Sequence, residues 1–155
     1  LTSSYRVNDI DTISSSSQTY NQSKVGYRIQ LTGQGEKILA EPAIFGGVVY
    51  FTSFVPGSAN DACVQAGTAK LNGVYLTTAN GVFAGGVRSM TIGTGIASAP
   101  IVSLKPSGGT GSIADLYVTV SGGGMTSAST QKVNFDPPGV SNRTNLLFWK
   151  DKRIQ

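Results

Sequence analysis

Apolar and polar residues alternate along much of the chain, which is the pattern of β-strands with one buried face. Across residues 25–31 every second residue is apolar. Residues 48–51 are apolar without a break, and such a run suits a strand covered on both faces. No segment has a convincing helical period, so the pattern predicts an all-β chain. Strands are expected near residues 25–31, 47–54, 71–78, 83–92, 98–104, 113–121 and 131–135, with a last candidate at 145–149.

Polar segments and turn residues divide the chain around these strands. Residues 1–24 are polar and serine-rich and are expected to form an extended lead-in, which leaves residues 25–155 as the β domain. Asn80-Gly81 is a strong signal for a two-residue hairpin turn. The residues expected in the core are Val49, Phe51, Ile101, Leu116 and Val118.

Part of the sequence is repeated. The segment 38–42 ends in proline and is followed by two glycines and then by Val-Tyr-Phe-Thr at 49–52. The segment 96–100 also ends in proline and is followed by a glycine-rich turn and then by Leu-Tyr-Val-Thr at 116–119. Proline and tyrosine are 8 residues apart in the first copy and 17 in the second. Most of the nine-residue difference falls in the turn region 105–112, where an insertion costs little.

Each copy of the repeat is typical of the start of a β-propeller blade, in which a short inner strand is followed by a longer one. Two unrelated hairpins with similar turns remain the alternative. A blade needs about 40–50 residues, so this chain provides about two blades plus flanking strands and cannot close a ring alone. We therefore expect a partial β-propeller, completed by a longer polypeptide or by another chain, with a small β-sandwich as the alternative fold. The strands at 25–31 and 145–149 are the edges expected to need a partner.

Composition limits the chemistry of the chain. Histidine is absent and the 8 acidic residues are not closely clustered, which removes the commonest general base and metal ligand. The 12 lysines and arginines are scattered, so the net charge of +4 does not predict a nucleic-acid surface. No apolar run is long enough for a membrane span, and no signal peptide is expected within the chain. These features predict a protein that is not an enzyme and that binds no cofactor.

The segments Gly26 to Leu31, Gly35 to Pro42 and Gly46 to Phe54 resemble the C-terminal propeller of the PilY/PilC family, which comprises type IV pilus assembly factors and tip-associated adhesins. Gly93 to Pro100 and the terminal Phe148 to Arg153 are similar to the end of the same domain. The resemblance runs from about residue 8 to the C-terminus, and the stretch 35–54 is its most specific part. It implies a propeller without an evident active site.

The resemblance implies a non-enzymatic protein of the cell surface or the pilus that acts in pilus assembly, extension or attachment. The partners would be type IV pilins or minor pilins, or the missing portion of the propeller, and the location would be extracellular. The family's acidic calcium loop is not found. Its nearest counterpart is the stretch 8–11, which lacks the later carboxylates, the mid-loop glycine and the closing glutamate.

Three residues are candidates for modification or cross-linking. Asn21 and Asn142 each begin a glycosylation sequon in a polar segment. Cys63 is the only cysteine, so it is either a free thiol or pairs with another chain. Relatives in the PilY/PilC family often carry a second cysteine nearby, and this chain does not.

Two other functions compete with the pilus factor. In the first alternative, the segment is a separately processed structural subunit that packs against other chains in an extracellular filament, as a homo- or hetero-oligomer. Open blade edges favour this role because another strand can pair with them. A remnant of a quinoprotein dehydrogenase is the enzymatic alternative, and the absence of histidine and of a carboxylate cluster counts against it.

Overall fold

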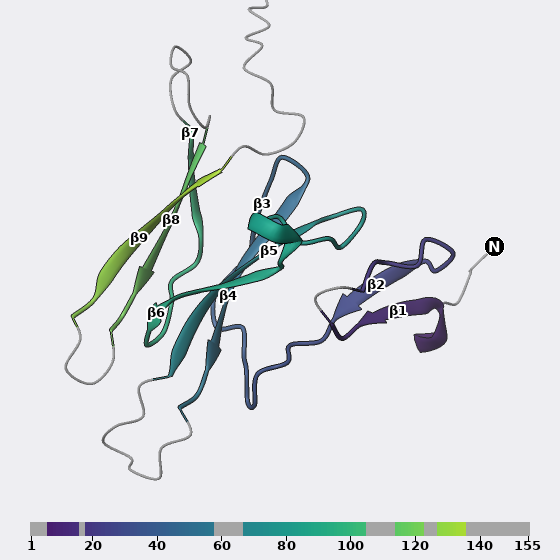
Figure 1. Cartoon of the computed structure of the whole chain (residues 1–155), viewed down its shortest axis with the longest axis horizontal. Helices are drawn as coiled ribbons and strands as arrows, with labels where there is room; N and C mark the ends of the chain where they lie inside the picture. The colour runs from purple at the N-terminus through teal and green to yellow at the C-terminus, as the bar shows by residue number, and fades with distance from the viewer. Residues whose placement is uncertain (1–5, 16–17, 58–66, 105–113, 123–126, 136–155) are drawn as a thin grey trace, which may run out of the picture.

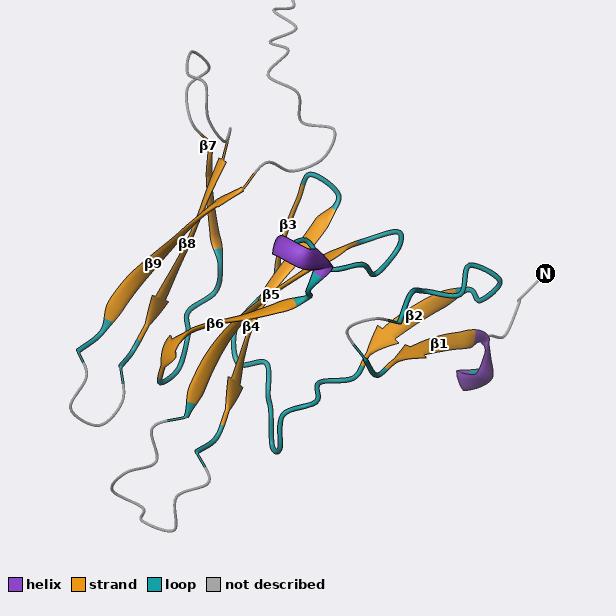
Figure 2. Ribbon diagram, in the orientation of Figure 1, coloured by secondary structure: helices purple, strands orange, loops and turns teal. Residues whose placement is uncertain are grey.

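The computed structural model describes residues 6–15, 18–57, 67–104, 114–122 and 127–135 of the chain. These residues form nine strands in three sheets, with two short 3-10 turns at Val7–Asp9 (η1) and Ala84–Gly86 (η2). Figure 1 shows the three sheets one beside another, and Figure 2 shows that strands and loops make up nearly all of the described chain. The expected all-β class is therefore confirmed.

The two larger sheets are antiparallel meanders, in which consecutive strands are neighbours. The first sheet has the order β3-β4-β5-β6, and the second has the order β7-β8-β9. The strands of the first sheet are β3 (Ala43–Phe45), β4 (Val48–Val55), β5 (Thr68–Tyr75) and β6 (Ser89–Thr94). Those of the second are β7 (Ile101–Leu104), β8 (Ala114–Val120) and β9 (Ser129–Phe135).

A third, smaller sheet is formed by β1 (Ile10–Ile13) and β2 (Gly26–Ile29), which pair in parallel. The polar lead-in therefore contains a strand, which the sequence pattern did not single out because β1 has only four residues. Figure 1 shows this β1–β2 pair on the opposite side of the first sheet from β7–β9. The first sheet is thus covered on both sides, as the unbroken apolar run at 48–51 predicts.

Most expected strands are present, but the region after Tyr75 is different. The strand expected at 71–78 runs from 68 to 75, and the strand expected at 83–92 begins only at Ser89. The two-residue turn expected at Asn80-Gly81 is wrong. The chain turns at residues 76–79, where Ala79 has a φ of 57°, and Gly81 instead forms a bridge with Val74.

Glycine is required at position 81 by a close backbone approach. A Cβ atom added there would overlap the carbonyl group of Val87 and the carbonyl oxygen of Gly86. The Asn-Gly pair therefore serves backbone packing in this chain and not a hairpin turn.

The two copies of the sequence repeat form equivalent hairpins. Pro42 directly precedes β3 and Pro100 directly precedes β7. The residue after each proline pairs with the repeat tyrosine, in the registers Ala43↔Tyr50 and Ile101↔Tyr117. The register agreement shows that the repeat in sequence is a repeat in structure.

The main core lies between the first and second sheets. Its fully buried side chains are Val48, Tyr50, Ala69, Leu71, Ile92, Ala97, Leu116, Val118 and Val120. The burial of Leu116 and Val118 was expected from the sequence and is confirmed. Burial of each valine, leucine or isoleucine side chain in this core contributes about 1.5–3 kcal/mol relative to an exposed position.

The other core expectations need correction. Val49 and Phe51 are only half-buried, because the alternate residues Val48 and Tyr50 face the second sheet. Ile101 is 64% exposed and was wrongly expected in the core. It lies in the edge strand β7 opposite Tyr117, on the face that points away from the first sheet. Side chains of a strand point to alternate faces of the sheet. An unbroken apolar run therefore does not indicate which of its residues face the core between the two sheets.

The two sheets pack through non-equivalent faces. The first sheet contributes the face that contains Tyr50, whereas the second contributes the face that contains Leu116 and Val118, opposite to that of Tyr117. Tyr50 and Tyr117 are equivalent in the repeat, so the sheets stack head to tail. A sandwich with two-fold symmetry would bring equivalent faces together.

Candidate functional site

Arg88 connects the β1–β2 pair to the first sheet through hydrogen bonds. It lies immediately before β6 and is only 8% exposed. Its guanidinium donates from Nε to the carbonyl oxygen of Ala79 at 2.5 Å, from Nη1 to that of Ser15 at 2.6 Å, and from Nη2 to that of Gln18. Burial lowers the pKa of Arg88, and the nearby Tyr27 partly opposes this. The Tyr27 hydroxyl adds hydrogen bonds to the carbonyl oxygens of Tyr75 and Leu76.

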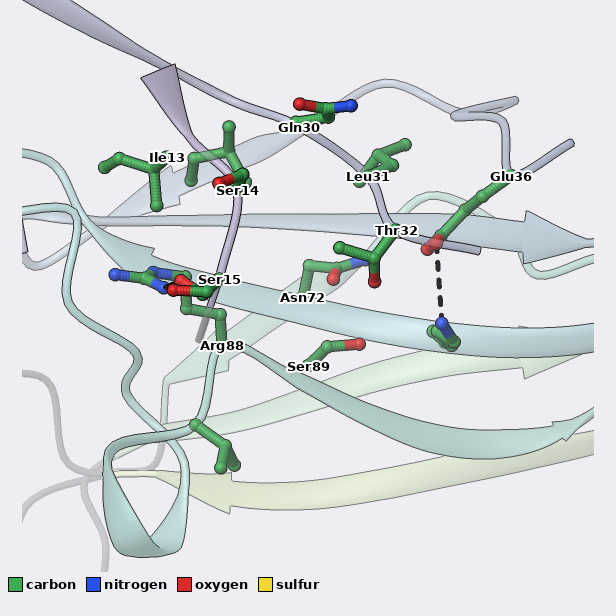
Figure 3. A pocket seen from close by; sticks show the side chains of 13 residues that line it. Ile13, Ser14, Ser15, Gln30, Leu31, Thr32, Glu36, Asn72, Arg88 and Ser89 are labelled. Atoms are coloured by element: carbon green, nitrogen blue, oxygen red, sulfur yellow. Dashed lines mark hydrogen bonds and ion pairs between the residues drawn. The ribbon is translucent and has the colours of Figure 1, made fainter. Parts of the chain in front are cut away.

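A cavity of about 210 Å³ lies between the β1–β2 pair and the first sheet. The carboxyl ends of β1 and β2 border it on one side, and residues of β5 and the start of β6 border it on the other (Figure 3). It is lined by Ile13, Ser14, Ser15, Ile29, Gln30, Leu31, Thr32, Glu36, Lys70, Asn72, Val87, Arg88 and Ser89.

Glu36 is the one carboxylate among these lining residues, and hydrogen bonds hold it in place. Its side chain is 3% exposed. Oε1 accepts from Ser53 Oγ at 2.6 Å, and Oε2 accepts from the Gly33 backbone N–H at 2.8 Å. Lys70 Nζ lies 3.4 Å from Oε2, and Asn72 Nδ2 donates to Ser53 Oγ at 2.9 Å.

The environment keeps Glu36 ionised. Burial alone would raise its pKa, but the hydrogen bonds from Ser53 and Gly33 and the positive charge of Lys70 outweigh burial and hold the pKa below its usual value. The cavity therefore has one negative charge, on Glu36, and two positive charges, on Lys70 and Arg88.

Ser53 and Glu36 form the cavity's closest approach to a catalytic pair. The hydroxyl of Ser53 contacts the Glu36 carboxylate, which is the pairing of a nucleophile with a base. Ser53 is only 2% exposed, however, and is not a lining residue, so a substrate in the cavity has no access to it. The described residues also hold no group of three or more metal-ligating side chains of the types His, Cys, Asp and Glu.

The candidate residues named from the sequence do not lie in this cavity. Asn21 is exposed in a turn, where its Oδ1 accepts hydrogen bonds from the backbone N–H of Ser23 at 3.1 Å and from its hydroxyl at 2.8 Å. Asn142 and Cys63 lie outside the described residues. In the stretch 8–11, the carboxylate of Asp9 accepts from the Arg6 backbone N–H and that of Asp11 from the Asn21 backbone N–H.

The sequence interpretation missed the cavity because its charged residues are far apart in the chain. Glu36 and Lys70 are separated by 34 residues, and neither belongs to a recognisable sequence motif. One signal was present: Lys70 is the one charged residue of β5, a strand that is buried over most of its length. A charged side chain there needs a nearby partner of opposite charge, but the sequence does not indicate which one.

Comparisons with family models, with curated proteins and with solved structures found no match. The fold and the site define an all-β protein with two head-to-tail antiparallel meanders and a small, net positive cavity beside the first.

Proposed function

We propose that this chain is the C-terminal propeller segment of a non-enzymatic type IV pilus factor of the PilY/PilC kind, acting in pilus assembly, extension or attachment. The residues of the family resemblance, at 26–31, 35–42 and 46–54, cover β2, the approach to β3, and most of β4. The most specific stretch therefore includes the first hairpin of the structural repeat.

The head-to-tail stacking of the two meanders is the observation that carries the propeller interpretation. Blades around an axis are related by repeated rotation, so one face of each blade packs on the opposite face of the next. The first and second sheets have this relation, and their first strands β3 and β7 contact each other. Inner strands of consecutive blades are neighbours in the same way.

The outer face of the second sheet supports its place at the end of a blade series. Apart from the exposed Ile101 of β7, the side chains on this face are polar or amphipathic and include Asp115, Tyr117 and Thr119 of β8 together with Thr130 and Lys132 of β9. Lys132 and Asp115 form an ion pair of 3.1 Å. A polar outer face is typical of terminal repeats, which contact solvent where internal repeats contact a neighbour.

The partners in this proposal are pilins or minor pilins, or the remaining blades, and the location is the cell surface or the pilus. Edge strands β3 and β7 offer a surface for them: Ile44, Ile101 and Leu104 are each more than 60% exposed. Among the described residues, no helix is long and apolar enough to span a bilayer.

The experiment is a pair of substitutions at the chromosomal locus in the producing organism. Val118→Asp places a charge in the core between the sheets, where Val118 is 1% exposed, and should abolish folding of the segment. Leu76→Asp is the control, at an apolar position that is 50% exposed and lies outside the edge strands β3 and β7. We expect surface pili, counted by electron microscopy, to be lost with the first variant and retained with the second. An unchanged pilus count with Val118→Asp would contradict the proposal.

The exposed edges of β3 and β7 also favour the second function, a separately processed subunit of an extracellular filament. The molecular mass of the polypeptide isolated from the cell surface distinguishes the two. A chain that extends far upstream of Leu1 supports the pilus factor, and a mass near 16.1 kDa supports the subunit.

A further inference from the structure

The charges around the cavity beside the first sheet do not cancel. Glu36 is paired with Lys70, whereas Arg88 contacts only backbone carbonyl oxygens in the part of the chain that the structure describes. Among the described residues, the charge of Arg88 therefore has no carboxylate partner at this partly open cavity. A cavity with a net charge of one positive unit attracts anions over neutral molecules, and a ligand with one carboxylate balances that charge.

Polar groups that are not used by the fold line the same cavity. The hydroxyls of Thr32 and Ser89 have no hydrogen bond within the described part of the chain, and Lys70 uses one of its three N–H groups on Glu36. Figure 3 shows Thr32, Asn72 and Ser89 between the Glu36–Lys70 pair and Arg88. Several donors and acceptors placed together suit a ligand with several hydroxyl groups.

The volume of the cavity and its apolar lining restrict the class of ligand further. A cavity of about 150 Å³ is known to hold one benzene ring, so a cavity of about 210 Å³ suits a single six-membered ring with substituents. Ile13, Ile29, Leu31 and Val87 provide apolar surface for the C–H groups of such a ring. No aromatic side chain lines the cavity, so a flat aromatic ligand would gain no stacking.

The geometry points to a binding site for a hydroxylated ring with one carboxylate, the chemical class of the hexuronic acids. The ammonium of Lys70 contacts the ligand carboxylate, and Thr32, Asn72 and Ser89 contact its hydroxyls. Arg88 is a positioning residue that holds the carboxyl end of β1 over the cavity and adds positive potential. The site concerns the cavity alone and does not depend on the pilus proposal.

Three probes of similar size separate the contributions of charge and hydroxyl groups. Sodium D-glucuronate has both, D-glucose has only the hydroxyls, and cyclohexanecarboxylate has only the charge. Protein-observed NMR titration at low salt should give saturable shifts with glucuronate at about millimolar concentration, a strength normal for a small polar ligand. Glucose and cyclohexanecarboxylate should each bind at least about tenfold more weakly. The largest shifts should map to the amides of Thr32, Asn72 and Ser89.

Two variants test the site, and a third is the control. Lys70→Met removes the ammonium and should weaken glucuronate binding at least about tenfold. Ser89→Ile fills the cavity from an exposed position and should abolish binding with no loss of fold. Lys132→Met removes a lysine that is paired with the buried carboxylate of Asp115 in the second sheet, away from the cavity, and should leave binding unchanged.

Lys70→Met leaves Glu36 without its ion pair, and this variant could fail to fold. The proposal is still tested in that case, because Ser89→Ile and the three probes do not disturb the Glu36–Lys70 pair. Equal binding of glucuronate and glucose, shifts that map to the second sheet, or full binding by Ser89→Ile would overturn it. So would the absence of saturable binding up to about 50 mM glucuronate, a concentration well above the expected dissociation constant.

Discussion

Glycines at different positions in this chain meet different surroundings. A methyl group at Gly81 would overlap the backbone of Gly86 and Val87, whereas a methyl group at Gly26 would meet nothing within 4 Å. We expect Gly81→Ala to destabilise the protein by about 1–3 kcal/mol or more, the usual effect of overpacking. Gly26→Ala should be neutral or stabilising by about 0.4–1 kcal/mol. Urea unfolding of both variants measures the difference, and equal midpoints would contradict the close approach at Gly81.

Tyr50 links stability to alkaline pH. Burial raises its pKa from 10.0 to about 12, with a smaller contribution from Tyr75. In the unfolded chain the phenol loses its proton near pH 10, while in the folded chain it keeps the proton until about pH 12. The folded state therefore binds more protons between these values, and stability must fall as pH rises through this window.

The measurement is the urea midpoint as a function of pH, from about pH 8 to pH 12. Tyr50→Phe should reduce the slope above pH 10 and leave it unchanged below. Burial also raises the pKa of Tyr27, so part of the slope should persist in this variant. An identical slope in the two proteins would show that Tyr50 is not protected from ionisation.

At the scale of elements, the attachment of the β1–β2 pair depends on Arg88. Arg88→Met keeps the apolar stem but removes three hydrogen bonds from a charged donor, each contributing about 1.5–3 kcal/mol. We expect amide exchange in β1 and β2 to accelerate at least about tenfold, with β4, β5 and β8 unchanged.

Arg28→Met is the control for this prediction. Arg28 lies in β2 and is exposed, and its Nε donates to Thr12 Oγ1 at 2.8 Å within the pair itself. It should leave exchange nearly unchanged. Uniform acceleration across all strands in Arg88→Met would mean that the β1–β2 pair unfolds only with the whole molecule.

The elements of the two larger sheets were largely predictable from local sequence. The repeat at 38–52 and 96–119 marked both hairpins, and their register agrees with it. β1 was not predictable, because a four-residue parallel strand gains its stability from its partner β2 and from distant contacts of Arg88. The turn at 76–79 was missed since Asn80-Gly81 is the stronger local signal and tertiary packing overrides it.

At the scale of the whole molecule, the first sheet is covered on both faces, whereas the edge strands β3 and β7 are open and expose apolar side chains. The edge at 25–31, expected from the sequence to need a partner, pairs with β1, whereas the candidate at 145–149 lies outside the described residues. Strands β3 and β7 each have one neighbour in the described chain and expose Ile44 and Ile101 at 65% and 64%. Self-association, expected at about micromolar concentration, should therefore run through these edges.

The test is the double variant Ile44→Lys with Ile101→Lys, because lysines on an edge strand oppose pairing with another strand. Sedimentation velocity should show the wild-type protein self-associating and the double variant as a monomer of about 16.1 kDa, with the same thermal midpoint. A wild-type protein that stays monomeric across the concentration range would show that its edges are already protected.

The cavity was the least predictable feature because residues from distant parts of the chain form it. Its lining comes from the ends of β1 and β2, a loop, β5 and the start of β6. The pairing of Glu36 with Lys70 depends on how β5 lies against the loop before β3, and local patterns contain no information on that contact. Lys70 is the one charged residue of the largely buried strand β5, which indicates that a partner is needed, and only the fold identifies that partner as Glu36.

The hydrogen bond between Arg88 and Ser15 spans 73 positions of the chain. A ribosome or an export channel releases the N-terminal residues first, so β1 emerges long before the Arg88 side chain that holds it to the first sheet. The first and second sheets, built from neighbouring strands, gain their contacts soon after they emerge. The interval between emergence and attachment is thus longer for β1 and β2 than for the strands of either larger sheet, and a transport machine that holds β1 and β2 would hold an unattached pair until Arg88 has emerged.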